Sequence, residues 1–361
     1  MDKKNAYVVI MAGGIGSRFW PLSKRSQPKQ FIDFMGTGKS LIRHTYERFA
    51  RQFDPTHIYV VTNREYATQV REHIPELGPE QVLEEPASKN TAPCVAFACY
   101  HIYAKNPDAV CVVAPSDHLI LDETRFLEHI GDAVSFAADS HVLCTLGITP
   151  TRPDTGYGYI QYNTVPAKDK FHKVRLFTEK PSAEIAQTFM DSGEFLWNSG
   201  IFIWKAATVI REFEQHLEDV AEHFQPLGVA GSAFPAPELI DQIYSLTRSI
   251  SIDYGILEQS EHVYVMPASF GWSDLGTWKS LHDISPKNEF NTSVIGKKVM
   301  TYDCADSLVF NSSGRLIVLK GVNNLVVVDS GDVVLILDKD HEQEIRQVVA
   351  DVRDAFREKF T

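Results

Sequence analysis

The stretch that decides the fold is "AYVVIMAGGIGSRF", residues 6–19, in which an apolar run gives way abruptly to glycines. The run at 6–12 is rich in β-branched residues and lacks polar alternation, which is typical of a strand buried on both faces of a parallel sheet. In open α/β sheets, ligands bind beyond the carboxyl ends of the strands. The glycines from Gly13 onward therefore lie where a binding loop is expected.

Other segments repeat the alternation of strand and helix that this first stretch begins. Apolar runs ending in polar or glycine residues recur at 57–63, 109–118 and 141–148, and helical patterns separate them at 40–53, 64–74, 91–106 and 124–140. Alternation at this spacing predicts an α/β domain built on a Rossmann-like, mixed and mostly parallel sheet. The polar loop at Ser116 to His118 is a second place where chemistry is expected.

The pattern changes twice along the rest of the chain. From Thr151, strands alternate with helical stretches at 182–193 and 206–224, which predicts a second lobe covering the first. Beyond Pro286, short strands separated by glycine and asparagine turns predict a small β-rich module of β-helix type, closed by a helix from His341. We therefore expect one large domain at 1–285 and one β-rich domain at 286–361.

Composition excludes several classes of protein. The 361 residues carry a formal net charge of -12, and no long basic stripe offers a face for nucleic acid. No apolar run is long enough to cross a membrane, and the N-terminal stretch does not resemble a secretory signal. The five cysteines are odd in number and never form a C-x-x-C pair, so they are expected to be reduced core residues. These features predict a cytoplasmic protein without a membrane or nucleic-acid partner.

Two glycine motifs imitate known nucleotide-binding loops without matching them. "GGIGSRF" satisfies only part of the dinucleotide pattern G-x-G-x-x-G, because Phe19 stands at the third glycine. "GTGKS", residues 36–40, ends like a P-loop, but Asp33 occupies the position of the first glycine. We interpret 36–40 as a turn that precedes a helix beginning at Leu41.

The segment 13–29 is still expected to bind phosphate. Glycines directly after a strand let backbone N–H groups approach an anion, and the four basic residues Arg18, Lys24, Arg25 and Lys29 supply positive charge. Between Asp2 and Asp33 there is no acidic residue. A tight turn with solvated charges would explain the glycines alone, but not this absence of acid.

The residues of this segment, "MAGGIGSRFWPLSKRSQPKQF", resemble the signature of the sugar nucleotidyltransferases, and of the mannose-1-phosphate guanylyltransferases in particular. Further motifs of that family follow in order: "EPASKNTAP" at 85–93, "APSDH" at 114–118, "GYGYI" at 156–160, "EKP" at 179–181, "WNSGIFIW" at 197–204, "SIDYGILE" at 251–258 and "GWSDLGTW" at 271–278. Ile15 and Ser17 depart from the serine and threonine usual in the glycine loop.

The resemblance implies an activity and its participants. It implies transfer of GMP from GTP to α-D-mannose 1-phosphate, giving GDP-mannose and pyrophosphate, with Mg²⁺ as cofactor. No protein nucleophile is needed for such a step, because charge neutralisation and alignment suffice. Many relatives carry an added isomerase domain, so this chain is expected to have the one activity. The resemblance also implies a homodimer, with the β-rich module serving assembly.

Site residues follow from the motif positions. The expected metal ligands are Asp117 and Asp274. Lys29 is expected at the triphosphate, Arg18 at the pyrophosphate and Lys180 at the sugar phosphate. The remaining assignments are nucleotide-binding residues Ala12, Gly13, Gly14, Gly16, Ser17, Glu85 and Asn90, and sugar-binding residues Gly158, Glu179 and Asn198.

Each assignment has a structural alternative. Asp117 could cap a helix or close a turn, Asp274 could occupy a turn, and Glu179 with Lys180 could form a surface ion pair. Asn90 and Thr91 could instead cap the following helix, and for Thr91 we expect this cap rather than a ligand contact. The tryptophans at 197, 204, 272 and 278 could serve as sugar platforms, but core packing is the favoured interpretation.

Three other functions are weighed against this interpretation. A nucleotidyltransferase for another hexose 1-phosphate would use the same motifs. A non-catalytic sugar-nucleotide sensor should have lost a metal carboxylate or a phosphate-binding base, yet all are present. A glycosyltransferase would need a D-x-D metal motif, and "PSDHLILD" at 115–122 has no second acid two residues from Asp117.

Overall fold

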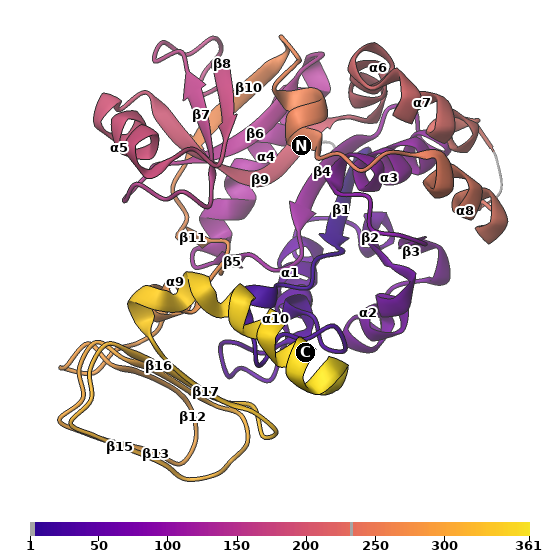
Figure 1. Cartoon of the computed structure of the whole chain (residues 1–361). Helices are drawn as coiled ribbons and strands as arrows, with labels where there is room; N and C mark the ends of the chain where they lie inside the picture. The colour runs from indigo at the N-terminus through magenta and orange to yellow at the C-terminus, as the bar shows by residue number, and fades with distance from the viewer. Residues whose placement is uncertain (1–3, 232–233) are drawn as a thin grey trace. The chain divides into compact units, whose positions relative to one another are not determined.

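The computed structural model describes residues 4–231 and 234–361 and contains two compact units (Figure 1). We call them the sheet unit and the coil unit. The sheet unit holds Met1–Gly13, Thr45–Ser116 and Ile120–Trp272, and the coil unit holds Gly14–His44, Asp117–Leu119 and Ser273–Thr361. The division of the sequence at 285/286 into two domains stays a prediction.

A nine-stranded sheet forms the centre of the sheet unit, in the order β3-β2-β1-β4-β9-β6-β10-β8-β7. Strand β1 pairs in parallel with β2 and β4, and β2 with β3, whereas β9 is antiparallel to both of its central neighbours. The predicted α/β class with a mixed sheet is therefore confirmed. The strands are β1 (Ala6–Ala12), β2 (Ile58–Asn63), β3 (Val82–Glu85), β4 (Val110–Pro115), β6 (Leu143–Ile148), β7 (Gly158–Tyr162), β8 (His172–Glu179), β9 (Phe195–Lys205) and β10 (Val263–Ala268).

The prediction of a separate second lobe from Thr151 is wrong. The segment adds strands to the same sheet, because β9 lies between β4 and β6 and also pairs with β7. The helix expected over 206–224 is also interrupted. Leu217 leaves helical geometry at φ -137° and separates α6 (Ala206–His216) from α7 (Glu218–Phe224). Its side chain is buried in the core of the unit, so tertiary packing overrides the continuous helical pattern there.

Helices cover the two faces of this sheet (Figure 1). Side chains of α3, α6 and α7 share one apolar cluster with Tyr7 and Val9 of β1, while α4 contacts β4, β6 and β9. Because Cβ atoms alternate along a strand, Val8 and Ile10 are buried on the opposite face. The helices of the chain are α1 (Leu41–Ala50), α2 (Ala67–His73), α3 (Thr91–Lys105), α4 (Glu123–Asp139), α5 (Ala183–Ser192), α6 (Ala206–His216), α7 (Glu218–Phe224), α8 (Pro237–Leu246), α9 (Trp278–Ile284) and α10 (Ile345–Phe356).

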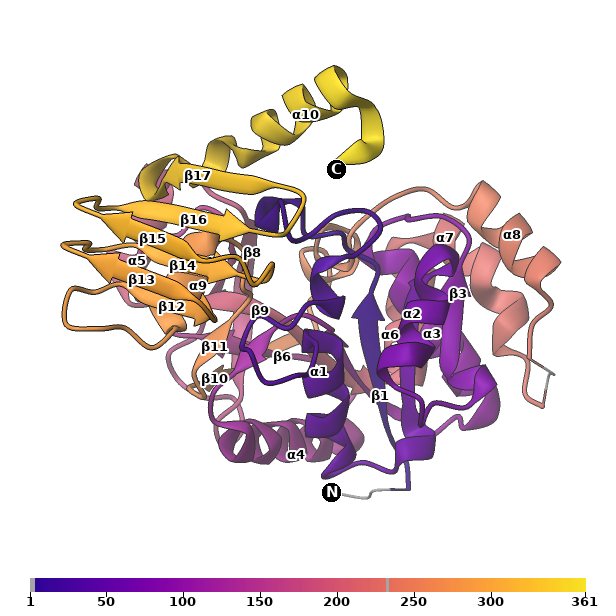
Figure 2. The same cartoon turned by 90° about the horizontal axis from the view of Figure 1, so that it is seen from below.

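The coil unit contains the predicted β-helix-like module. Strands β12, β14 and β16 pair in parallel, as do β13 and β15, so that successive coils of the chain stack side by side (Figure 2). An antiparallel strand, β17, closes the stack next to β16. These strands are β12 (Ser293–Gly296), β13 (Val299–Tyr302), β14 (Leu308–Asn311), β15 (Ile317–Lys320), β16 (Leu325–Asp329) and β17 (Val334–Asp338). The closing helix α10 starts at Ile345, after a 3-10 turn at Lys339–Glu344, rather than at His341.

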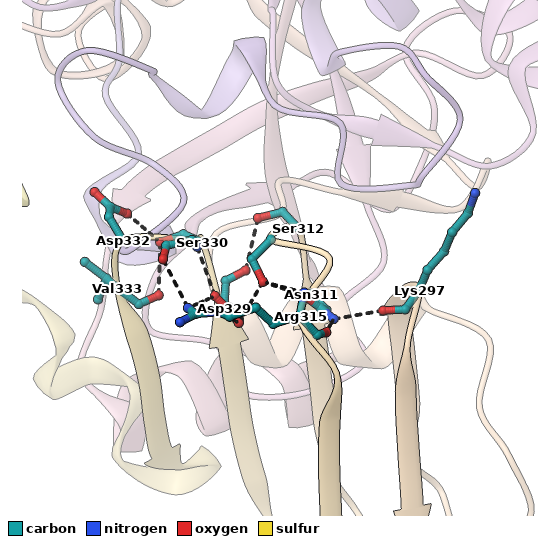
Figure 3. A network of polar contacts seen from close by, with 10 residues as sticks. Lys297, Asn311, Ser312, Arg315, Asp329, Ser330, Asp332 and Val333 are labelled. Carbon is teal, nitrogen blue, oxygen red and sulfur yellow. Dashed lines mark hydrogen bonds and ion pairs between the residues drawn. The ribbon is translucent and has the colours of Figure 1, made fainter.

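One corner of these coils is held by a polar network (Figure 3). Arg315 donates to both carboxylate oxygens of Asp329, at 2.9 and 2.6 Å, and the backbone N–H of Gly331 donates to Asp329 Oδ1 at 2.9 Å. The Arg315 hydrogen bonds lower the pKa of the Asp329 carboxyl to about 2. Asn311 Nδ2 donates hydrogen bonds to the backbone carbonyls of Lys297 and Arg315, at 2.8 and 2.7 Å. The network thereby fixes the turn at Ser330–Val333.

Other expectations from composition can be checked directly. All five cysteines are free and buried, as predicted. Trp197, Trp204 and Trp278 are buried in apolar clusters, which confirms core packing for these three. Among residues 4–231 and 234–361, no helix is long and apolar enough to cross a membrane.

Candidate functional site

The signature loop, Gly14 to Lys29, follows β1 and belongs to the coil unit. Its glycines lie at the surface, with Gly14 exposed and Gly16 in a left-handed conformation at φ 73°. A Cβ on Gly16 would lie 2.5 Å from the Cβ of Lys29, so no other residue fits there without displacing Lys29. The backbone N–H of Lys29 donates to the carbonyl of Ile15 at 3.0 Å. The conformation of the glycine turn and the position of Lys29 therefore depend on each other.

Lys29 is the centre of the polar contacts in this unit. Its side chain is only 5% exposed, and Nζ donates to Asp117 Oδ2 at 2.8 Å and to the backbone carbonyl of Asp274 at 2.6 Å. Burial on its own would raise the pKa of the Asp117 carboxyl, but the charges of Lys29 and His118 lower it below its ordinary value. One buried ammonium therefore brings together the two loops that carry the expected metal ligands.

The Asp274 loop is shaped by its own side chain. Asp274 Oδ1 accepts from the backbone N–H of Gly276 at 3.0 Å, and a Cβ on Gly276 would come within 2.6 Å of Asp274 Oδ2. Leu275, between them, has a positive φ of 46°. The turn considered as the alternative role of Asp274 is therefore present, and it is closed by the 3.0 Å hydrogen bond from Gly276 N–H to Asp274 Oδ1.

The donor chemistry of this unit suits a hard divalent cation. Mg²⁺ is usually held by one or two carboxylates, with waters and substrate phosphates completing its shell. Asp117 and Asp274 supply two carboxylates whose loops are joined through Lys29. Within the described residues, no cluster of three or more His, Cys, Asp or Glu side chains is found.

The four basic residues of the signature loop have different surroundings. Lys29 pairs with Asp117, and Lys24 pairs with Asp332 at 2.8 Å. Arg25 is exposed at the tip of the turn that the backbone hydrogen bonds between Lys24 and Gln27 close. Arg18 is partly exposed. The loop is therefore not a uniform patch of unpaired positive charge.

The segment 36–40 has a sequence that imitates a P-loop, but the Asp33 carboxylate accepts hydrogen bonds from its backbone N–H groups. Asp33 accepts hydrogen bonds from the backbone N–H groups of Met35 and Thr37, each at 3.1 Å, and of Gly38 at 2.6 Å. These donors are the kind that a phosphate would use. The predicted turn before Leu41 is confirmed, because α1 begins at that residue.

The sheet unit contains a second group of predicted residues, around Glu85 at the end of β3. Glu85 is 5% exposed, and Tyr244 Oη donates to its Oε1 at 2.9 Å. Burial raises the pKa of Glu85 to about 7, against the opposing effect of the Tyr244 hydrogen bond. Gly13 lies beside it, since a Cβ on Gly13 would be 3.7 Å from Glu85 Oε2. A ligand group that donates two hydrogen bonds would suit this carboxylate.

The helix cap predicted for Thr91 is wrong. Asn90 caps α3, accepting from the backbone N–H of Thr91 at 2.9 Å, and it holds a positive φ of 69°. Thr91 is the first helical residue, and its hydroxyl accepts from the backbone N–H of Ile252 at 2.9 Å. Asparagine tolerates a positive φ better than threonine, which has a branched Cβ, and this explains why Asn90 rather than Thr91 caps the helix.

A third group lies around Glu179 in the sheet unit. Gly158 pairs with Glu179 across β7 and β8, and a Cβ on Gly158 would stand 2.4 Å from Glu179 Oε2. Glu179 also accepts a hydrogen bond from Lys180, whose side chain is 58% exposed. The surface ion pair foreseen as an alternative for these two residues is thus present. Asn198 Oδ1 accepts from the backbone N–H of Gly200 at 3.0 Å, which orients its amide.

Two residues of these groups were not singled out from the sequence. Asp253 accepts from Asn198 Nδ2 at 2.8 Å, and burial, followed by the nearby Glu179 carboxylate, raises the pKa of Asp253 to about 6. It stands inside the motif "SIDYGILE", so the motif itself was the available signal. Tyr244, the partner of Glu85, lies on α8 outside every quoted motif, and no sequence signal pointed to it.

We predict that ionisation of Glu85 lowers the free energy of unfolding as pH rises. Its pKa of about 7 lies above the ordinary value of 4.5, so the folded state holds a proton that the unfolded state has lost. Stability is unaffected below pH 4.5 and falls by about 3 kcal/mol as pH rises to 7. Glu85→Gln removes this titration, so its unfolding free energy relative to wild type should rise by about 2 kcal/mol between pH 5 and 8, measured in urea.

Glu84→Gln is the matched control for this prediction. Glu84 is the preceding residue of β3 and forms an ion pair with Arg71 at 2.8 Å. Its amide variant should gain no stability relative to wild type as pH rises. A pH-independent difference between Glu85→Gln and wild type would contradict the raised pKa.

Comparison with known proteins places the chain in a family. Residues 7–290 match the family described as "Nucleotidyl transferase", and residues 297–352 match "MannoseP isomerase/GMP-like beta-helix domain". The chain is 34% identical to a "Mannose-1-phosphate guanylyltransferase" of Salmonella muenchen, covering 94% of this chain and 72% of that protein. It is 35% identical to "Xanthan biosynthesis protein XanB" of Xanthomonas campestris pv. campestris, covering 98% and 74%.

A solved structure is similar over nearly the whole length. It is a "mannose-1-phosphate geranyltransferase" from Thermus thermophilus, and it superimposes with a TM-score of 0.86 at 30% identity, covering 97% of this chain and 99% of that one. The eight motifs lie within residues 7–290, and strands β13 to β17 of the coil unit lie within residues 297–352. On these grounds the chain belongs to the nucleotidyl transferase family and carries the family's β-helix module at its C-terminal end.

Proposed function

We propose that this protein transfers GMP from GTP to α-D-mannose 1-phosphate, releasing pyrophosphate and forming GDP-mannose. The observation that carries the proposal is the Lys29 ammonium, which joins Asp117 and the Asp274 loop at three signature positions of a nucleotidyl transferase. The names of both similar proteins support mannose 1-phosphate as a substrate, and the name of the Salmonella muenchen protein supports the guanylyl group.

The coil unit would handle the phosphates. A Mg²⁺ ion bound by Asp117 and Asp274 would neutralise phosphate charge and hold the α-phosphate in position. The partly exposed Arg18 would meet the leaving pyrophosphate, and the backbone donors of Gly14, Gly16 and Ser17 would approach the nucleotide. Lys29 is buried against Asp117, so its direct part would be to fix that carboxylate and to present one remaining N–H to the triphosphate.

The sheet unit would recognise the base and the sugar. Ala12 and Gly13 would lie under the nucleotide, and the Glu85 carboxylate would accept the two hydrogen bonds that guanine offers from N1–H and its amino group. Asn90 would stay near the base only through its backbone, since its side chain caps α3. Gly158, Glu179 and Asn198 would bind the sugar hydroxyls, with Lys180 at the sugar phosphate. Assembly as a homodimer and a cytoplasmic location remain predictions.

A coupled pyrophosphate-release assay tests the proposal. It should be run with four nucleoside triphosphates against mannose 1-phosphate and other hexose 1-phosphates, with Mg²⁺ present. GTP with mannose 1-phosphate should give the highest kcat/KM. Higher activity with another sugar phosphate would favour the alternative hexose, and no release with any pair would favour the sensor.

Asp117→Asn and Asp274→Asn should each lower turnover by about two orders of magnitude or more, because each removes a metal-neutralising charge. The amide preserves shape, so circular dichroism and thermal unfolding should report a folded protein. The measurement is steady-state kinetics over a range of Mg²⁺ concentration. Wild-type activity with Mg²⁺ in either variant would remove that residue from the metal site.

Lys29→Met should cost at least ~2 kcal/mol of transition-state stabilisation, because it removes the ammonium and leaves Asp117 without its partner. Methionine fills most of the space of the lysine chain against Gly16. Arg25→Met is the matched control, since Arg25 is exposed in the same loop; it should change kcat/KM only modestly, and less as salt rises. Lys29→Met activity within twofold of wild type would place the phosphates elsewhere.

The dimer can be tested through the coil unit. Several large apolar side chains of its strands are exposed, among them Met300, Val318 and Ile336 at 46%, 53% and 61%. Light scattering at micromolar concentration should show a dimer, because such strand faces are otherwise left in water. A fully active monomer would contradict the expected role of this module in assembly.

A further inference from the structure

We propose that the C-terminal segment positions the signature loop, through an ion pair between Asp332 and Lys24 and a hydrogen bond between Trp20 and the Phe360 carbonyl. We call these two contacts the latch. The inference rests on the proposed function for its catalytic consequence. It assigns a positioning role to Lys24, which was expected to supply positive charge for phosphate. It also assigns one to Asp332, in a module that was expected to serve assembly.

The signature loop needs such support because its own secondary structure is slight. Between Gly14 and Ile32 it has two 3-10 turns, Ser17–Phe19 and Lys29–Phe31, and one isolated bridge between Lys24 and Gln27. Backbone hydrogen bonds, such as those from Phe19 to Gly16 and from Lys29 to Ile15, close these turns only locally. Side-chain contacts must therefore fix the loop against the rest of the coil unit.

Apolar contacts supply one part of that support. Phe19, Trp20 and Leu22 share a buried cluster with residues of the coils and of α10. The Phe34 ring lies 6.2 Å from that of Phe310 on β14, and Trp278 Nε1 donates to the Trp20 carbonyl at 3.3 Å. The loop thus rests on the core of the C-terminal module.

The two polar contacts of the latch fix the position of the signature loop on this apolar cluster. Trp20 Nε1 donates to the Phe360 carbonyl at 2.8 Å, joining residues 340 apart in sequence. Lys24 Nζ donates to Asp332 Oδ2 at 2.8 Å, and its side chain is only 13% exposed. This hydrogen bond lowers the pKa of the Asp332 carboxyl. Trp20 and Lys24 follow shortly after Arg18, so the latch fixes the chain next to that guanidinium.

Asp332 is itself held in place by the corner network (Figure 3). Ser330 Oγ donates to Asp332 Oδ1 at 3.2 Å, and the Ser330 N–H donates to the Val333 carbonyl at 3.0 Å. Asp329, bound by Arg315, accepts the N–H of Gly331 in the same turn. The network therefore presents a preorganised carboxylate to Lys24, which lowers the entropic cost of the pair.

A charge exchange separates this role from a substrate contact. Lys24→Asp and Asp332→Lys should each lower kcat/KM about fivefold, the order expected for a pair of this exposure. The double exchange, Lys24→Asp with Asp332→Lys, should recover kcat/KM to within about twofold of wild type. If Lys24 bound a substrate phosphate, aspartate at 24 would repel it, and the double variant would stay impaired.

Hydrogen–deuterium exchange gives a readout that does not depend on activity. Backbone exchange over residues 17–31 should rise in each single variant and in Trp20→Phe, and return to the wild-type level in the double exchange. Asp132→Lys is the control, because it breaks a surface pair with Lys170 in the sheet unit and should leave both readouts unchanged. Wild-type exchange in the single variants, or no recovery in the double, would overturn the latch. If the wild-type protein did not form GDP-mannose, the proposed function would be wrong. The hydrogen–deuterium exchange result would still test the latch.

Discussion

A buried ammonium ion is stable only where oxygen atoms surround it, and Lys29 obtains them from loops that are 88 and 245 residues away in sequence. Removing such a charge from water is costly unless it is paired and hydrogen-bonded. The position of Lys29 is in turn set by Gly16, which leaves no room for a Cβ. The geometry of the residues proposed to bind phosphate thus depends on one glycine, one lysine and one carboxylate together.

The carboxylates of the sheet unit follow a different rule. Glu85 and Asp253 have pKa values raised to about 7 and 6 mainly by burial, and each accepts a hydrogen bond from a neutral partner rather than from a cation. A ligand that donates further hydrogen bonds to such a buried carboxylate would stabilise its ionised form. Binding a hydrogen-bonding base or sugar would therefore relieve a cost already present in the fold.

The sequence predicted the fold class and the β-rich module correctly. The apolar run before the glycines defined β1, and the glycine and asparagine turns indicated the coils, because both are local signals of burial and of backbone geometry. It could not show that β9 inserts between β4 and β6, because strand order depends on contacts distant in sequence. Tyr244, and the pairing of Lys24 with Asp332, were missed for the same reason. Thr91 was assigned the wrong role because helix propensity does not reveal which of two adjacent residues adopts a positive φ.

The turn around Asp33 has a consequence for how this chain could change. Its backbone N–H groups form an anion cradle, and the group that fills it is a side chain of the same segment. A carboxylate attached to the chain competes at a high effective concentration, so a free phosphate is excluded without any steric barrier. A substitution that removes this side-chain oxygen, such as one to alanine, would leave the three backbone N–H groups without their present acceptor, in the stretch whose letters imitate a nucleotide-binding motif.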